Sequence, residues 1–235
     1  VSMLPQPPPN AQAPIPSEAA LRSRRRFRGI WIVGTISMLG LAISPMFVGR
    51  KRTNCDPTEE VNNARQIGLA LDEFETEYGK FPDATTIAEV RRKSGSLLSL
   101  GTISSNDYFR QILASGIAVS EAMFDAKVHG TRRPDGVTTK GEALKIGECG
   151  FTYFLGATTK DNPGRPLVVS PMIPGTDRFD PKPFKGKAVI LRLDNSVTSL
   201  PIDKDGHVIL YGRNMMDPHH PIWDGHAPVI AWPDF

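Results

Sequence analysis

Apolar residues recur every three or four positions between residues 57 and 79, a spacing that predicts one amphipathic helix of about six turns. Asp56 can cap the free N–H groups at its start, and Pro57 suits the first helical position. Gly79 ends the pattern, and Pro82 prevents the helix from resuming. The stripe consists of Val61, Ala64, Ile67, Leu71, Phe74 and Tyr78.

Shorter elements follow this helix. Capping and terminating residues predict three small helices, over residues 86–93, 108–115 and 120–127. Alternating and aromatic-rich runs predict strands over 151–155, 167–170, 188–193, 196–202 and 207–211. Asp194 and Asn195 form the turn of a predicted hairpin. The order of elements predicts an α+β domain, with the long helix packed on a small antiparallel sheet.

A long uncharged stretch, Ile30 to Val48, precedes this domain. As a helix with a rise of ~1.5 Å per residue it would be roughly 28 Å long, close to the ~30 Å hydrocarbon core of a bilayer. Soluble helices rarely run this far without a polar face, which favours a transmembrane helix over a buried soluble one. A cleaved signal peptide is the other alternative, but no small-x-small cleavage site follows the stretch.

The orientation of this anchor follows from its flanking charges. Basic residues are more numerous before the stretch (Arg22, Arg24, Arg25, Arg26 and Arg28) than after it (Arg50, Lys51 and Arg52). This bias predicts a single-pass protein of the inner membrane with a cytoplasmic N-terminus and a periplasmic domain. The net charge is +3, and the basic flanks account for it, so the sequence offers no argument for a nucleic-acid partner.

The chain is accordingly predicted to have five parts. A proline-rich, basic and disordered tail comes first, followed by the anchor and a short linker. The α+β domain comes next and is followed by a proline-rich irregular tail. The boundaries are 1–29, 30–48, 49–56, 57–213 and 214–235.

Residues that could support chemistry are few. Motifs for nucleophilic, zinc-protease or phosphate-binding sites do not occur, so no catalytic site is predicted. Asp203 and Asp205 form a fragment of a calcium-loop pattern, with a plain polar turn as the alternative. His219 and His220 are weak metal candidates, with surface histidines as the alternative. No cofactor is therefore predicted, and calcium is the one left open.

The two cysteines, Cys55 and Cys149, lie far apart in the sequence. They are too few for a disulfide framework and lack the spacing of a zinc site. In an oxidising periplasm they could form one disulfide, and two unpaired thiols are the alternative.

Two stretches resemble known proteins. Residues 62–71 (NNARQIGLAL) with Phe74 and residues 78–82 (YGKFP) resemble the first soluble helix and following loop of type IV pilin-like proteins, including the major pseudopilin of type II secretion systems. Residues 188–200 resemble the late hairpin of that group. The resemblance implies a pilin-like fold and adds to the calcium interpretation, because major pseudopilins bind calcium in loops near the sheet.

In function, the resemblance implies a non-catalytic subunit of a bacterial envelope secretion or surface apparatus. Its partners would be the membrane and other pilin-like or secretion-system subunits. A membrane-tethered extracytoplasmic hydrolase or ligand-binding module is the alternative.

The sequence departs from the pilin pattern at its leader. Pilins are cut after a leader glycine and then carry a glutamate at the fifth position, which neutralises a neighbour's amine. Gly29 is present, but residues 30–34 read IWIVG and contain no glutamate. A glutamate in the membrane is costly unless paired, so its absence suggests that no such amine is there to pair with. The leader is therefore predicted to stay attached, making the chain a fixed or minor component.

Overall fold

The computed structural model describes residues 57–138 and 143–235, which belong to one unit of the chain. The predicted N-terminal tail, transmembrane segment and linker lie outside the described residues. Within the described part, no helix is both long enough and apolar enough to cross a membrane.

The first described helix, α2 (Thr58–Tyr78), confirms the apolar stripe. Ala64, Ile67, Leu71 and Phe74 have no exposed surface, because their spacing places them on one face of the helix. Gly79 ends α2 in the left-handed conformation, and its N–H donates to the Glu75 carbonyl.

The shorter helices begin and end at different residues from those predicted. Helix α3 spans Ile87–Ser94. Helix α4 spans Ser105–Ala114, because Ser104 rather than a later residue forms a capping box with Asp107. The predicted helix over 120–127 is a 3-10 turn, η2 (Glu121–Phe124), which ends where Asp125 becomes extended.

Five strands form one antiparallel sheet in the order β4-β3-β2-β1-β7. The β3–β4 turn contains Asn195 with a φ of 62°. The predicted strand over 207–211 is instead part of a separate two-stranded hairpin. The sheet strands are β1 (Thr152–Leu155), β2 (Pro166–Ser170), β3 (Lys187–Arg192), β4 (Val197–Pro201) and β7 (Val229–Ala231), and the hairpin strands are β5 (Ile209–Leu210) and β6 (Arg213–Asn214).

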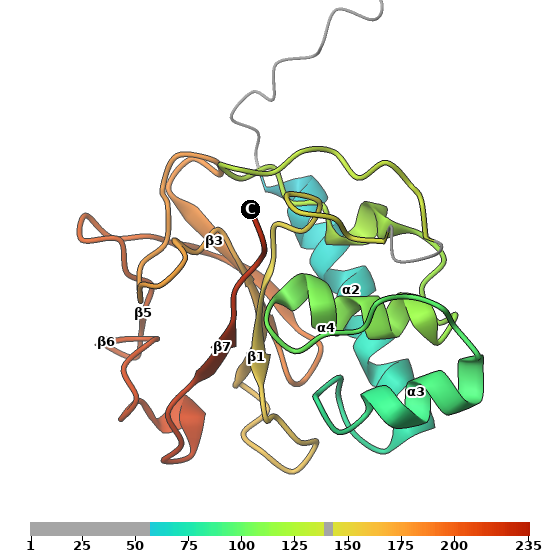
Figure 1. The fold of residues 1–235 in the computed structure, drawn as a ribbon. Helices are drawn as coiled ribbons and strands as arrows, with labels where there is room; N and C mark the ends of the chain where they lie inside the picture. Colours follow the sequence, from blue (N-terminus) through green and yellow to red (C-terminus); the bar gives the residue numbers. More distant parts are fainter. Residues whose placement is uncertain (1–56, 139–142) are drawn as a thin grey trace, which may run out of the picture. The chain divides into compact units, whose positions relative to one another are not determined.

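Both faces of the sheet are apolar and covered. Successive side chains of a strand point to opposite faces, so Tyr153 lies in one buried cluster and Phe154 in the other. Helix α2 packs on β3 and β4 on the first face, with α4 beside it. The second cluster includes Val208, Met215 and Trp223, from the chain that follows β4. Figure 1 shows the helices on one side of the sheet and the β5–β6 hairpin on the other.

Residues 214–235 are therefore not an irregular tail outside the domain. Strand β7 pairs with β1, matching Ala231 to Tyr153. Trp223 is fully buried, its ring centroid is 5.1 Å from that of Phe154, and its Nε1 donates to the Met215 carbonyl at 2.9 Å. Composition suggested a tail because proline-rich segments lack periodicity, but this segment supplies the cover for an apolar sheet face.

The fold class predicted from the sequence is wrong. It combined an N-terminal transmembrane helix with one long helix on a small antiparallel sheet, as in pilins. The described residues instead form three α-helices and a five-stranded antiparallel sheet, and none of these helices can cross a membrane. The physical reason is that this sheet has two apolar faces and a C-terminal edge strand, so one helix cannot complete the core.

Candidate functional site

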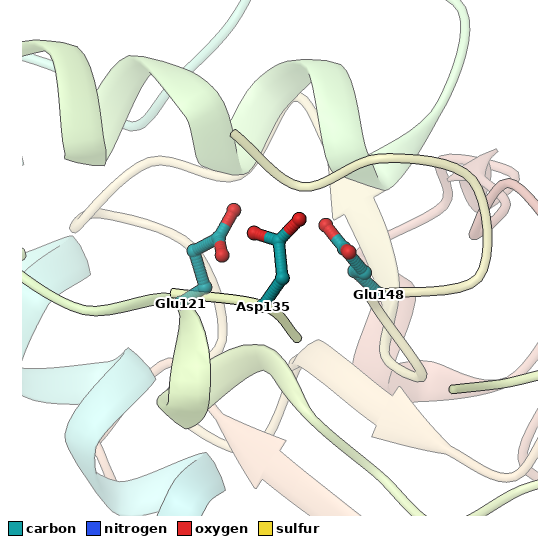
Figure 2. A group of neighbouring side chains, drawn as sticks. All are labelled: Glu121, Asp135 and Glu148. Carbon is teal, nitrogen blue, oxygen red and sulfur yellow. The ribbon is translucent and has the colours of Figure 1, made fainter. Parts of the chain in front are cut away.

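Three carboxylates from distant parts of the sequence meet beside η2 and α4. Glu121, Asp135 and Glu148 each place one oxygen within 4.8 Å of the others, close enough to hold one cation together (Figure 2). Glu121 and Glu148 are buried, whereas Asp135 is exposed. Oxygen-only sets of this kind suit calcium or magnesium. These are the residues of the described chain that could hold a metal.

Local turns bring these carboxylates together. Glu121 is the first residue of η2, which begins after Ser120 caps the Ala122 N–H. Gly136 follows Asp135 with a φ of 79°, and Gly147 precedes Glu148 with a φ of 82°. Glycine adopts such angles without strain, so both carboxylates lie directly beside turns that favour glycine.

The chain itself already supplies partners for these oxygens. The two oxygens of Glu121 accept from the N–H groups of Leu144 and Gly136. Glu148 accepts from the Lys145 N–H at 2.8 Å and lies 3.3 Å from the Arg132 guanidinium. These bonds tie together the segment that runs from η2 to β1.

Asp135 is held in the same way. Its Oδ2 accepts from Lys145 Nζ at 2.9 Å, and its Oδ1 accepts from the Val137 N–H. The Lys145 ammonium lowers the pKa of Asp135, whereas burial and the neighbouring carboxylates raise the pKa of Glu121. These contacts hold the segment from η2 to β1 in place, and a cation would have to replace some of them.

The sequence did not point to this group. Its members are spaced too widely for any known ligand pattern, and two of them, Asp135 and Glu148, lie in a segment with no predicted element. Gly136 and Gly147 mark the turns, but a turn does not indicate which carboxylates will meet.

The metal candidates proposed from the sequence serve other roles. Asp203 Oδ1 accepts from the N–H groups of Asp205 and His207, which lowers the Asp203 pKa. This is the polar-turn alternative. His220 is buried: its Nδ1 accepts from the Ile222 N–H, and its Nε2 lies 3.0 Å from the Leu210 carbonyl.

His219 lies at the surface, with its Nδ1 3.3 Å from Asp217 Oδ1. The metal-capable group found among the described residues includes none of the four candidates Asp203, Asp205, His219 and His220.

The disulfide hypothesis stays a prediction, because Cys55 lies outside the described residues. Cys149 is fully buried, with its Sγ 3.7 Å from Ser105 Oγ. Burial raises the pKa of the Cys149 thiol to about 12. Mass spectrometry of non-reduced peptides decides whether the pair is bridged.

Comparisons with protein-family models, with curated proteins and with solved structures find no match to this chain. The likeness of residues 62–82 and 188–200 to pilin-like proteins therefore remains a prediction from short motifs.

Proposed function

We propose that this chain is a non-catalytic subunit of a bacterial envelope secretion or surface apparatus. Residues 30–48 anchor it in the inner membrane as a single pass, with a cytoplasmic N-terminus and the described domain in the periplasm. The uncharged run and its unequal basic flanks support the anchor and its orientation.

The observation that carries this proposal is how α2 is built into the domain. It begins at Thr58, after the nine residues that follow the proposed anchor, and four of its side chains, from Ala64 to Phe74, are completely buried. The helix that follows the linker is therefore fixed to the core of the domain. Such a coupling suits a subunit that must hold a fixed position in an assembly.

The outward face of α2 is available for contacts with other subunits. It carries the exposed side chains of Arg65, Gln66 and Glu73. Among them Leu69 is 64% exposed, a large apolar side chain on a polar surface. The motif that resembles pilin-like proteins includes this face, and it supports the same proposal.

The competing function is a membrane-tethered hydrolase or ligand-binding module. The histidines considered for chemistry do not favour it, because His220 is used to cap the 3-10 helix η3 (Pro221–Trp223) and His219 lies 3.3 Å from Asp217. Turnover of esters, glycans or peptides by the purified full chain would favour this alternative.

Site-directed photo-crosslinking in cells tests the proposal. A photoreactive amino acid at Leu69 should give a crosslinked product of defined mass, either with another subunit or with a second copy. The same amino acid at Lys204, in an exposed turn, is the matched control and should give much less product. Crosslinking at neither position would contradict the assembly role.

A separate measurement tests the anchor. The full chain should stay in membranes washed with alkaline carbonate, and protease added to osmotically opened cells should digest the domain. Release by carbonate, or protection from protease until the inner membrane is dissolved, would show that the anchor or its orientation is wrong.

A further inference from the structure

A hollow of about 650 Å³ lies outside the acidic group already described. Much of its lining is apolar and comes from Met172, Ile173, Phe235 and three prolines. Ile173 is 41% exposed and Phe235 is 39% exposed, so the hollow has an apolar wall that is open to solvent.

The hollow adjoins the first turn of α2. Lys127 lines it, and the Lys127 ammonium donates to Glu59 in that turn. The Lys127 N–H also contacts Glu60 Oε1 at 3.4 Å. In Figure 1 the start of α2 and the C-terminal residues lie at the same end of the domain. This is the end at which the chain arrives from the proposed anchor.

Lys127 and Lys182 line the hollow, and the acidic lining residue is Asp180. Lys127 is already paired with Glu59, so it adds no positive charge for an outside ligand. Lys185 is exposed nearby, in the turn that leads to β3. Within the described residues, neither Lys182 nor Lys185 makes a salt bridge, so two ammonium groups are left for an external anion.

We propose that this face docks on the anionic phospholipid headgroups of the membrane that holds the chain. The inference rests on the anchor in the proposed function. Residues 49–57 can span at most about 30 Å, at ~3.5 Å per residue, so this end of the domain stays close to the bilayer. Lysines near an anionic surface are attracted to it, and apolar side chains beside them enter the interfacial region.

The test uses the full chain reconstituted in vesicles. A fluorophore is attached to Ile173→Cys in a Cys55→Ser background, in which Cys149 is buried and unreactive. Lipids with spin-labelled headgroups should quench it more strongly in phosphatidylcholine mixed with phosphatidylglycerol than in phosphatidylcholine alone. Reversing Lys182 and Lys185 to Glu should lower the docked-to-undocked ratio at least about fivefold for each lysine.

The matched control reverses two cations at the other end of the domain. Arg91 lies in α3, whose Lys93 contacts Glu77 near the end of α2, and Lys160 lies in the loop after β1. Arg91→Glu with Lys160→Glu changes the net charge equally and should leave the quenching unchanged. Circular dichroism confirms that both double variants are folded.

Two results would overturn the inference. Equal quenching in the two kinds of vesicle would show that anionic headgroups are not the ligand. Weak lipid quenching together with energy transfer between labelled copies would show that a second copy covers the face. If the full chain does not insert into vesicles, the anchor fails and with it the proposed function, a result separate from quenching in inserted protein.

Discussion

Gly68 in α2 lies directly against Asn195 in the β3–β4 turn. A Cβ atom at Gly68 would be 1.9 Å from the Asn195 side-chain oxygen. The Asn195 amide also donates to Asp72 Oδ2, one turn further along the same helix, at 2.8 Å. Glycine inside a helix costs roughly 0.5–1 kcal/mol relative to alanine. The close approach explains why this position favours glycine in spite of that cost.

The first prediction tests this contact. Gly68→Ala should lower the free energy of unfolding by roughly 1–3 kcal/mol, because the added methyl group forces the turn away from α2. Urea unfolding measures the change. Leu69→Ala, at the exposed neighbouring position, should stay within about 0.5 kcal/mol of the parent.

Combining Gly68→Ala with Asn195→Gly should recover much of the loss, since glycine accepts the left-handed conformation of residue 195 and removes the clashing oxygen. Simple addition of the two single losses would show that the contact is not the cause.

The second prediction concerns the acidic group. Glu121→Gln should destabilise the domain by about 1–3 kcal/mol, because an amide NH₂ would face the N–H of Gly136 or Leu144, and that N–H would lose its acceptor. Hydrogen exchange of residues 131–138 and 143–148 should increase. Asp135→Asn is the control, since this exposed residue bonds mainly at the surface, and its effect should be smaller.

Added calcium tests whether this acidic group only holds the surrounding segment in place or also binds a cation. Because the carboxylates already have partners, calcium should leave the unfolding midpoint unchanged. A rise in the midpoint that is lost in Glu148→Gln would show instead that a cation displaces Lys145.

The third prediction concerns pH. Glu60 is 1% exposed, and its Oε2 has no hydrogen-bond partner in the described part of the chain. Burial raises the pKa of Glu60 above its ordinary value of 4.5, so the folded state holds this proton more tightly than the unfolded chain. Protonated Glu60 therefore contributes its full stabilisation of the folded state at pH values below that ordinary pKa. This contribution is lost as pH rises through the pKa of Glu60 in the folded state.

Glu60→Gln should therefore be more stable than the parent at neutral pH, and the difference should shrink as pH falls toward 4.5. Urea unfolding at a series of pH values measures it. Glu73→Gln, on the exposed face of the same helix, should show no such trend. A Glu60→Gln variant that is less stable at neutral pH would mean that the carboxylate is stabilised by its neighbours.

The fourth prediction concerns the cover of the second sheet face. Trp223→Ala should cost about 3–5 kcal/mol, because it empties the centre of that cluster. Trp223→Phe keeps most of the packing and loses the bond from Nε1 to Met215, so it should cost only about 1 kcal/mol. Equal unfolding midpoints for the parent and Trp223→Ala would contradict the buried position of this side chain.

Sequence reasoning reached the candidate site only in part. It located the turn at Asp203, because the residues that close such a turn are neighbours in the chain. It could not find the group of Glu121, Asp135 and Glu148, since their meeting depends on how a long irregular segment folds back on α4. It gave His220 as a weak metal candidate, with a surface histidine as the alternative, whereas the packing of η3 buries this residue.

The sequence by itself determined α2 and its last residue, because helix periodicity and a terminating glycine act between residues three or four positions apart. Only the tertiary structure decided that β7 joins the sheet beside β1, across a separation of some 75 residues, and that the chain between β4 and β7 covers the second face. Such pairings depend on which apolar surfaces remain uncovered once the local elements have formed. Because these pairings depend on the folded chain as a whole, they leave no local pattern in the sequence.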